Sequence, residues 1–258
     1  MELLKSAKRR SRLSDILYVA FNVLFAAAVF GFTVAFTPPY FAYLLVLLSK
    51  WRVFAVRPRF WFANLQANMV DVLVGLSIVT LIWQGSESLA LQIFLAVLYG
   101  IWLLVLKPQS RRRWVVMQAS ISQFLAITAL FSLSYLAYAS IIVALGWVIG
   151  YVAARHVLMH HEESEATLLS LFWGLVSAEL AWLAYHSTTA YGVPDVLLIP
   201  QVALITAVLG FAIYTLYQKY RENDGVASFK GIGRKLLFSG LLLILLIGRE
   251  IATVIQTL

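Results

Sequence analysis

The chain has 258 residues and a net charge of +8, and 62% of its residues are hydrophobic while 12% are charged. Soluble domains are only about half apolar, so this composition and a mean hydropathy of +0.86 exclude a water-soluble globular protein. The cations are scattered over short segments, which argues against a nucleic-acid-binding face. The absence of cysteine excludes disulfides and thiolate chemistry.

Apolar windows of about 20 residues, the length that crosses a bilayer, recur along the whole chain. They predict an all-α, polytopic membrane bundle of about nine transmembrane helices that forms a single domain over residues 1–258. Strands of a barrel are excluded because the runs lack alternation of apolar and polar residues. The predicted spans, in chain order, are residues 16–36, 40–56, 69–83, 89–106, 114–134, 138–158, 167–185, 196–217 and 236–255.

The basic residues predict the orientation of these spans. With the amino terminus in the cytoplasm, every Lys and Arg except Arg249 falls in a cytoplasmic turn or at the cytoplasmic end of a span, which is the positive-inside pattern. We therefore expect an integral plasma-membrane protein, of the bacterial inner-membrane type, whose cytoplasmic face contacts anionic lipid headgroups. Binding to other membrane proteins or to further copies of the chain stays open.

A first polar cluster is expected around the second and third spans. Asp71 follows Asn68 and Asn64 at spacings of three and four residues, so all three side chains share one helix face. An antiparallel turn centred near Phe60 brings Lys50 to the depth of Asp71. Because an ionised group in hydrocarbon costs at least about 2.5 to 3.5 kcal/mol, we expect Lys50 and Asp71 to form an ion pair. That pair is either a static structural contact or part of a site that titrates or binds a ligand.

A second cluster is expected from the seventh and last spans. Glu179 and Arg249 both lie about 13 residues beyond the inner end of their span, which puts both roughly 20 Å from the cytoplasm. His186 follows Glu179 by seven residues and shares its helix face. These three residues would suit an outward-opening site of a proton-coupled carrier. They would equally suit a contact that fastens three helices together.

The densest polar segment lies where the sixth span leaves the membrane. His156 and His160 are one helical turn apart, and together with Glu163 they form a ligand set that zinc accepts. The whole chain has only four histidines, too few for the histidine boxes of a di-iron membrane enzyme. We expect this segment to be a solvated loop, and the alternative is a site for a single metal ion. We expect no cofactor.

Three functions stay open. A small carrier or channel is the leading hypothesis, because charged groups lie inside the bundle and the soluble loops are short. A structural subunit or scaffold of a membrane complex is the first alternative, because the chain shows no recognisable chemistry. An integral-membrane enzyme acting on lipid-type substrates is the second. The lack of a nucleotide-binding loop, a nucleophile elbow or a zinc-protease motif argues against an enzyme.

Overall fold

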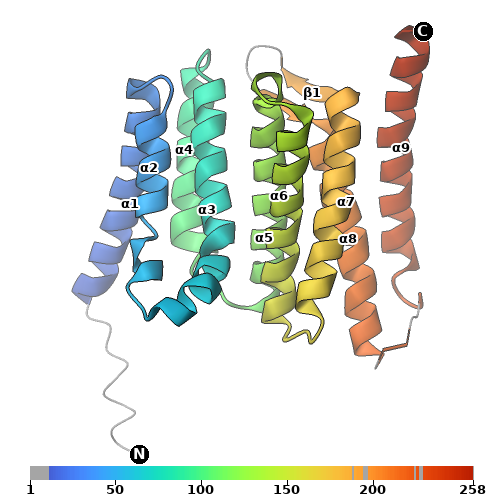
Figure 1. The fold of residues 1–258 in the computed structure, drawn as a ribbon, viewed down its shortest axis with the longest axis horizontal. Coiled ribbons are helices and arrows are strands. Elements are labelled where there is room, and N and C mark those ends of the chain that lie inside the picture. The colour runs from blue at the N-terminus through green and yellow to red at the C-terminus, as the bar shows by residue number, and fades with distance from the viewer. Residues whose placement is uncertain (1–11, 188, 194–196, 224, 227–228, 258) are drawn as a thin grey trace, which may run out of the picture.

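The computed structural model describes residues 12–187, 189–193, 197–223, 225–226 and 229–257, without the side chains of 12–13, 193, 197 and 249–257. In this part of the chain, helices run side by side in a broad slab (Figure 1). They are α1 (Arg12–Ala35), α2 (Tyr40–Leu48), α3 (Trp61–Gln84), α4 (Leu89–Ile101), α5 (Arg112–Ser132), α6 (Ala139–His160), α7 (Ala166–His186), α8 (Gln201–Glu222) and α9 (Gly233–Thr257).

Shorter elements connect these helices. They are the 3-10 helices η2 (Trp51–Phe54), η3 (Pro58–Phe60) and η5 (Ser134–Leu136), the π-helical turn η4 (Trp102–Leu106), and the strands β1 (Ala190–Val193) and β2 (Leu197–Pro200). The two strands form an antiparallel hairpin in which Tyr191 pairs with Ile199. Next to the hairpin, Gln201 accepts a hydrogen bond from Tyr191 at 3.0 Å and donates one to the carbonyl of Leu246 at 2.6 Å. Gln201, the first residue of α8, thereby connects the hairpin to α9.

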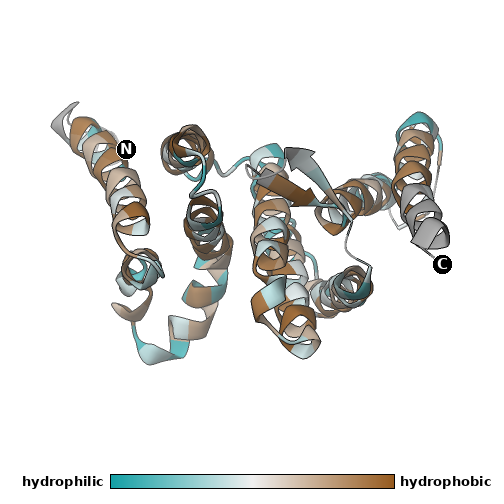
Figure 2. Ribbon diagram, turned by 90° about the horizontal axis from the view of Figure 1, so that it is seen from above, coloured by the Kyte–Doolittle hydropathy of each residue, from teal (hydrophilic) through white to brown (hydrophobic). Residues whose placement is uncertain are grey.

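The helices have the length and composition of membrane spans. Seven candidate spans lie in the described residues: Ser14–Ala35, Pro58–Gln84, Leu89–Leu106, Arg112–Ser132, Ala139–His160, Ala166–His186 and Gln201–Glu222. Apolar residues dominate the helices seen from above (Figure 2), and large apolar side chains such as Phe21 and Phe172 are exposed. Exposed apolar surface of this extent requires lipid around it. The chain is therefore an all-α, membrane-embedded protein, as its composition predicts.

The number of nine spans is not confirmed. The second predicted span forms a helix of only nine residues, α2, which ends at Leu48. A continuous helix would have pointed Lys50 and Arg52 about 200° apart, so one of the two cations would have faced hydrocarbon. The break after α2 lets Lys50 turn inward while Arg52 is exposed. The last predicted span is the helix α9, but the side chains at its far end lie outside the described residues.

Two helices begin at other residues than the predicted spans. The helix α3 begins at Trp61, eight residues before the predicted span, because the polar residues of its first turns continue the helix outside the apolar window. The helix α8 begins at Gln201, because the apolar run that starts at Leu197 pairs as a strand of the hairpin. Pro200 marks the boundary, since proline lacks the N–H that a helix interior needs.

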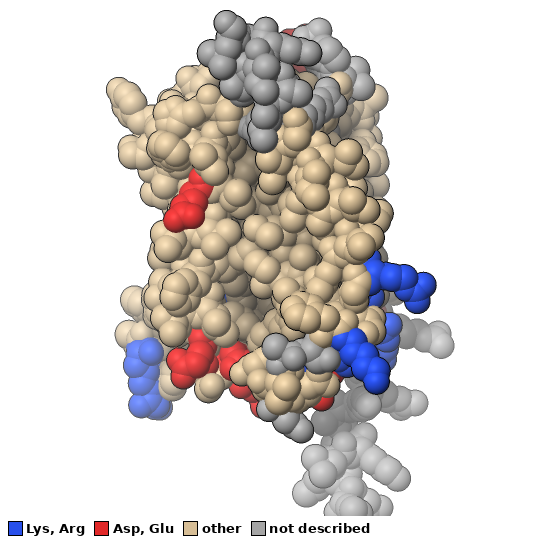
Figure 3. All heavy atoms as spheres, turned by 90° about the vertical axis from the view of Figure 1, so that its right-hand side faces the viewer, with Lys and Arg blue, Asp and Glu red and all other residues tan. Residues whose placement is uncertain are grey.

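Most cations gather at one end of the slab, which we call the basic end. This is the end at which α1 begins and at which α2 is joined to α3, α4 to α5, α6 to α7 and α8 to α9 (Figure 1). On the side of α7 to α9, the cationic side chains lie in the lower part of the surface (Figure 3). Figure 3 also shows one acidic side chain partway up this surface.

The closest helix contact is between α6 and α7. The motif Gly-x-x-x-Gly of residues 146–150 faces small residues of α7, and a Cβ atom on Gly150 would lie 3.0 Å from the carbonyl oxygen of Trp173. A Cβ atom on Gly174 would likewise lie 3.0 Å from the carbonyl oxygen of Trp147. Close backbone approach through small residues is the usual way in which helices pack without a hydrophobic driving force. Sequence reasoning missed this contact although the motif was visible.

The turn from α6 to α7 is held by hydrogen bonds around a left-handed residue. Glu162 has φ of 53°, its N–H bonds to the carbonyl of Met159 at 3.2 Å, and the next N–H, of Glu163, bonds to the carbonyl of Leu158 at 3.1 Å. This is the Schellman arrangement, in which glycine is the preferred residue at the left-handed position. The motif turns Glu163 toward α8.

We expect Glu162→Gly to stabilise the protein by about 1 kcal/mol, because a side chain in the left-handed region costs about that much. Thermal unfolding in detergent micelles measures the change. Glu165→Gly is the matched control, since Glu165 has φ of −96° and glycine brings no such relief there. A lower midpoint for Glu162→Gly than for the unchanged protein would contradict the assignment of this turn.

Candidate functional site

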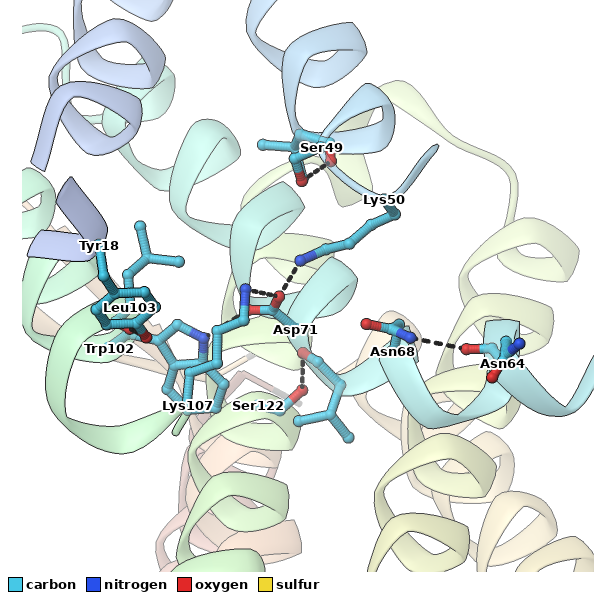
Figure 4. A network of polar contacts seen from close by, with 12 residues as sticks. Tyr18, Ser49, Lys50, Asn64, Asn68, Asp71, Trp102, Leu103, Lys107 and Ser122 are labelled. Carbon is cyan, nitrogen blue, oxygen red and sulfur yellow. Dashed lines mark hydrogen bonds and ion pairs between the residues drawn. The ribbon is translucent and has the colours of Figure 1, made fainter. Parts of the chain in front are cut away.

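The most irregular part of the bundle surrounds Asp71, in the middle of α3. The side chain is buried, with 8% of the residue exposed. Lys50 approaches from the segment that follows the break in α2, where the hydroxyl of Ser49 bonds back to the carbonyl of Val46 at 2.6 Å. Two interrupted helices, α2 and α4, therefore meet at one buried carboxylate (Figure 4).

The carboxylate of Asp71 has three partners. Lys50 forms an ion pair with its Oδ2, which confirms the ion pair predicted from the sequence. Lys107 places its Nζ 2.7 Å from the same oxygen, and the indole N–H of Trp102 donates to Oδ1 at 2.8 Å. Sequence reasoning missed both of these partners and assigned Lys107 to a cytoplasmic turn. We call Lys50, Asp71, Trp102 and Lys107 the Asp71 cluster.

The π-helical turn η4 explains how Trp102 and Lys107 reach the same carboxylate. On an α-helix, residues five apart point about 140° away from each other. Here the N–H of Lys107 bonds to the carbonyl of Trp102 at 2.8 Å, an i→i+5 bond that widens the turn and aligns the two side chains. Turns of this kind occur often at functional sites. In the same turn, the carbonyl of Leu103 accepts a bond from the hydroxyl of Tyr18 at 3.2 Å.

The Asp71 cluster contains more positive than negative charge. Two ammonium groups share one carboxylate oxygen, so one positive charge is in excess when all three groups are ionised. The side chain of Lys50 is 13% exposed and that of Lys107 is 38% exposed. Lys107 follows η4 directly and leads into the turn at the basic end. The excess charge is therefore inside the bundle but within reach of solutes at that end.

The two asparagines that were predicted to share a helix face with Asp71 do not join the Asp71 cluster. Asn68 donates from its side-chain amide to the carbonyl of Asn64 at 2.8 Å, one turn back along α3 (Figure 4). Neither side chain bonds to Asp71 among the described residues. Gly75, one turn beyond Asp71 on the same face of α3, allows a close helix approach, because a Cβ atom there would lie 2.6 Å from Cγ1 of Val46.

The second predicted cluster can be followed at two of its three members, Glu179 and His186. Both are exposed, and the side chain of Arg249 lies outside the described residues. The small residues of α7 that face α6 fix its rotation, and at about 100° per residue Glu179 and His186 point away from that face. Glu179 has no hydrogen bond or ion pair with the described part of the chain. His186 packs instead against the rings of Trp182 and Tyr185, with centroids 5.1 and 5.4 Å apart.

The three residues of the weak metal hypothesis are not brought together. His156 contacts Gln118, its Nε2 lying 3.1 Å from Oε1 of the amide, while His160 is exposed. Glu163 faces α8, where it accepts hydrogen bonds from Tyr217 at 2.6 Å and Arg221 at 3.0 Å. No group of three metal-binding side chains occurs in the residues that the structure describes.

The turn around Glu163 is a polar network at the basic end. Hydrogen bonds from Tyr217 and Arg221 hold the pKa of Glu163 below its ordinary value. Burial, and then the cations Arg112 and Arg221, lower the pKa of His161. At neutral pH, Glu163 is therefore charged and pairs with Arg221, while His161 is neutral.

A cavity that sequence reasoning did not anticipate lies above this network. It has a volume of about 300 Å³ and is lined by residues of α5, α6, α7 and α8. Gln123 lies at its upper end and accepts a hydrogen bond from the indole N–H of Trp173 at 3.2 Å. Tyr214 and Tyr217 lie at its lower end. Neither Asp71 nor Glu179 lines this cavity.

Comparison of the chain with protein-family models, with curated proteins and with solved structures finds no match. Its class is therefore defined by its own fold and site. It is a membrane-embedded helical bundle with a buried carboxylate held by two lysines.

Proposed function

We propose that the protein is a small carrier or channel for an anion, and that the Asp71 cluster is its binding site. The observation that supports this is that a broken helix and a π-helical turn meet at a buried carboxylate. The two lysines that pair with this carboxylate leave one positive charge in excess. Transporters commonly form their sites where membrane helices are discontinuous. Ionisable groups inside membranes are costly, which makes them functional candidates by default.

The charge of the cluster determines which kind of solute it favours. An uncompensated charge in a protein interior loses its hydration without gaining a partner. A small anion that enters from the basic end beside Lys107 supplies the missing negative charge. A cation would meet two ammonium groups and would be repelled. Chloride, phosphate and small carboxylates are therefore the solutes to test.

We further propose nine passes in the plasma membrane, of the bacterial inner-membrane type, with the basic end in the cytoplasm. The segment of α2 with η2, and the helix α9, would add two passes to the seven candidate spans. Cations at the basic end follow the positive-inside rule. They would also contact anionic lipid headgroups.

The variant Lys107→Gln tests whether the Asp71 cluster is a carrier site or a structural contact. It removes the excess charge but keeps Lys50 and Asp71 as a neutral pair. We expect anion flux into proteoliposomes to fall roughly 10- to 100-fold, the effect of losing one charge-assisted hydrogen bond. The midpoint of thermal unfolding in detergent should change little.

Lys219→Gln is the matched control, because Lys219 lies at the same end and, among the residues that the structure describes, pairs only with the nearby Glu222 at 3.2 Å. Its anion flux should equal that of the unchanged protein. A parallel loss of flux and stability in Lys107→Gln would mark the cluster as a structural contact. Flux no higher than that of empty liposomes for all three anions would refute the carrier and favour a structural subunit.

A further inference from the structure

The cavity among α5, α6, α7 and α8 has the position and shape of a binding site that is separate from the Asp71 cluster. Its lining runs along the lower half of the four helices, from Gly210 and Gln123 to Tyr217. Gly210 lies twelve residues and Tyr217 five residues before the end of α8, so the cavity is roughly 10 Å long. Its volume of about 300 Å³ is at the lower limit of cavities that hold small ligands.

The lining excludes charged ligands. None of its sixteen residues is Asp, Glu, Lys, Arg or His. The closest ion pair below it is Glu163 with Arg221, and these two groups neutralise each other at 3.0 Å. A charged ligand would lose its hydration without finding a counter-charge among the lining residues.

Hydrogen-bond donors remain available in the lining. Among the described residues, the hydroxyl of Tyr214 has only a long contact, 3.5 Å, to Nε2 of His161. The amide nitrogen of Gln123 has one contact, also at 3.5 Å, with the hydroxyl of Ser177, although it carries two N–H donors. The hydroxyl of Ser120 lines the cavity and bonds to no described residue. The complementary group on a ligand is a hydrogen-bond acceptor.

The entrance faces the membrane. Leu169 and Phe172 of α7 and Ile213 of α8 line the cavity and are exposed on the outer surface, at 39%, 58% and 44%. All three lie within candidate membrane spans. A ligand that passes between α7 and α8 therefore arrives from the hydrocarbon phase.

We propose that this cavity binds an uncharged, lipid-soluble molecule that carries a hydrogen-bond acceptor such as a carbonyl group. The molecule enters between α7 and α8, and its acceptor bonds to Tyr214 or to Gln123. Trp173 contacts the bound molecule from the wall of the cavity. The proposal does not depend on the Asp71 cluster.

Three brominated single-ring probes test the proposal in lipid nanodiscs at one probe-to-lipid ratio: bromoacetophenone with a carbonyl, bromoethylbenzene without an acceptor, and bromobenzoate with a charge. Bromine quenches tryptophan fluorescence on contact, so the part of the quenching that Trp173→Phe removes reports the cavity. We expect the quenching constant of this Trp173-dependent part to be about fivefold larger for bromoacetophenone than for bromoethylbenzene, which is the effect of one neutral hydrogen bond. Bromobenzoate should give none.

Gly210→Leu fills the cavity and should abolish the Trp173-dependent quenching. A Cβ atom at Gly210 makes an ordinary contact of 3.5 Å with the ring of Trp173, so the helix accommodates a side chain there. Ala154→Leu is a second filling variant, and Gly31→Leu, with nothing within 4 Å of its Cβ position, is the control. Lys107→Gln should bind the probe normally, which separates this site from the proposed carrier site.

Equal quenching by all three probes, or quenching that persists in both filling variants, would overturn the proposal. So would the absence of any Trp173-dependent quenching in the unchanged protein.

Discussion

Asp71→Asn should lower the free energy of unfolding by about 3 to 5 kcal/mol, the typical cost of removing one partner from a buried ion pair. The substitution keeps the shape of the side chain but leaves Lys50 and Lys107 close together without a counter-charge. It also weakens the acceptor for Trp102, whose indole N–H is buried. Unfolding by a denaturing detergent, followed by circular dichroism, measures the loss.

Lys50→Met is the matched comparison for Asp71→Asn. It leaves Asp71 and Lys107 as a neutral pair and replaces Lys50 by an apolar side chain of similar length, so we expect a loss of at most about 1 kcal/mol. The double variant should be less destabilised than the sum of the single variants, because the two side chains interact directly. If Asp71→Asn costs no more than Lys50→Met, the carboxylate does not hold the two cations.

Gly150→Ala should destabilise the protein by about 1 to 3 kcal/mol, the usual range for overpacking a close contact. The new Cβ atom would overlap the side chain of Ser177 and would lie 3.0 Å from the carbonyl oxygen of Trp173. Ser177 can rotate its hydroxyl, but its Cβ atom, 2.5 Å away, and the backbone of Trp173 cannot yield without moving α7. The measurement is the same denaturing-detergent titration.

Gly31→Ala is the control for this packing prediction. Gly31 lies in α1, and a Cβ atom there meets nothing within 4 Å. Alanine has the higher helix propensity, by about 1 kcal/mol in water, so this variant should be neutral or more stable. Similar losses in Gly150→Ala and Gly31→Ala would contradict the close contact between α6 and α7.

The depth of a residue in the membrane could be predicted from the sequence. The direction in which its side chain points around the helix could be predicted only in part. Counting residues from a turn placed Lys50 level with Asp71, and the ion pair is present. The same counting gave Glu179 a depth but assigned it the wrong direction. Its direction follows from the small residues of α7, from Ser170 to Ala181, which pack on α6. Their spacing of three and four residues was readable in the sequence.

Other features of the site have no local signal in the sequence. The π-helical turn that brings Lys107 to Asp71 depends on the carboxylate in a different helix, so composition around Trp102 does not reveal it. The cavity arises because small residues of four helices, such as Ala119, Ala153 and Gly210, leave space where those helices meet. Which helices meet is a property of the whole bundle. The fold class follows from composition, because only lipid tolerates so apolar a chain.

Anion-dependent stability of the unchanged protein tests the central claim most directly, because a ligand that binds the folded state raises its stability. Thermal unfolding in nanodiscs should be followed while chloride or phosphate replaces a bulky organic anion at constant ionic strength. We expect the midpoint to rise with one of the small anions in the unchanged protein and to stay constant in Lys107→Gln. Equal rises in both proteins, or none in either, would contradict an anion site at Asp71, Lys50 and Lys107.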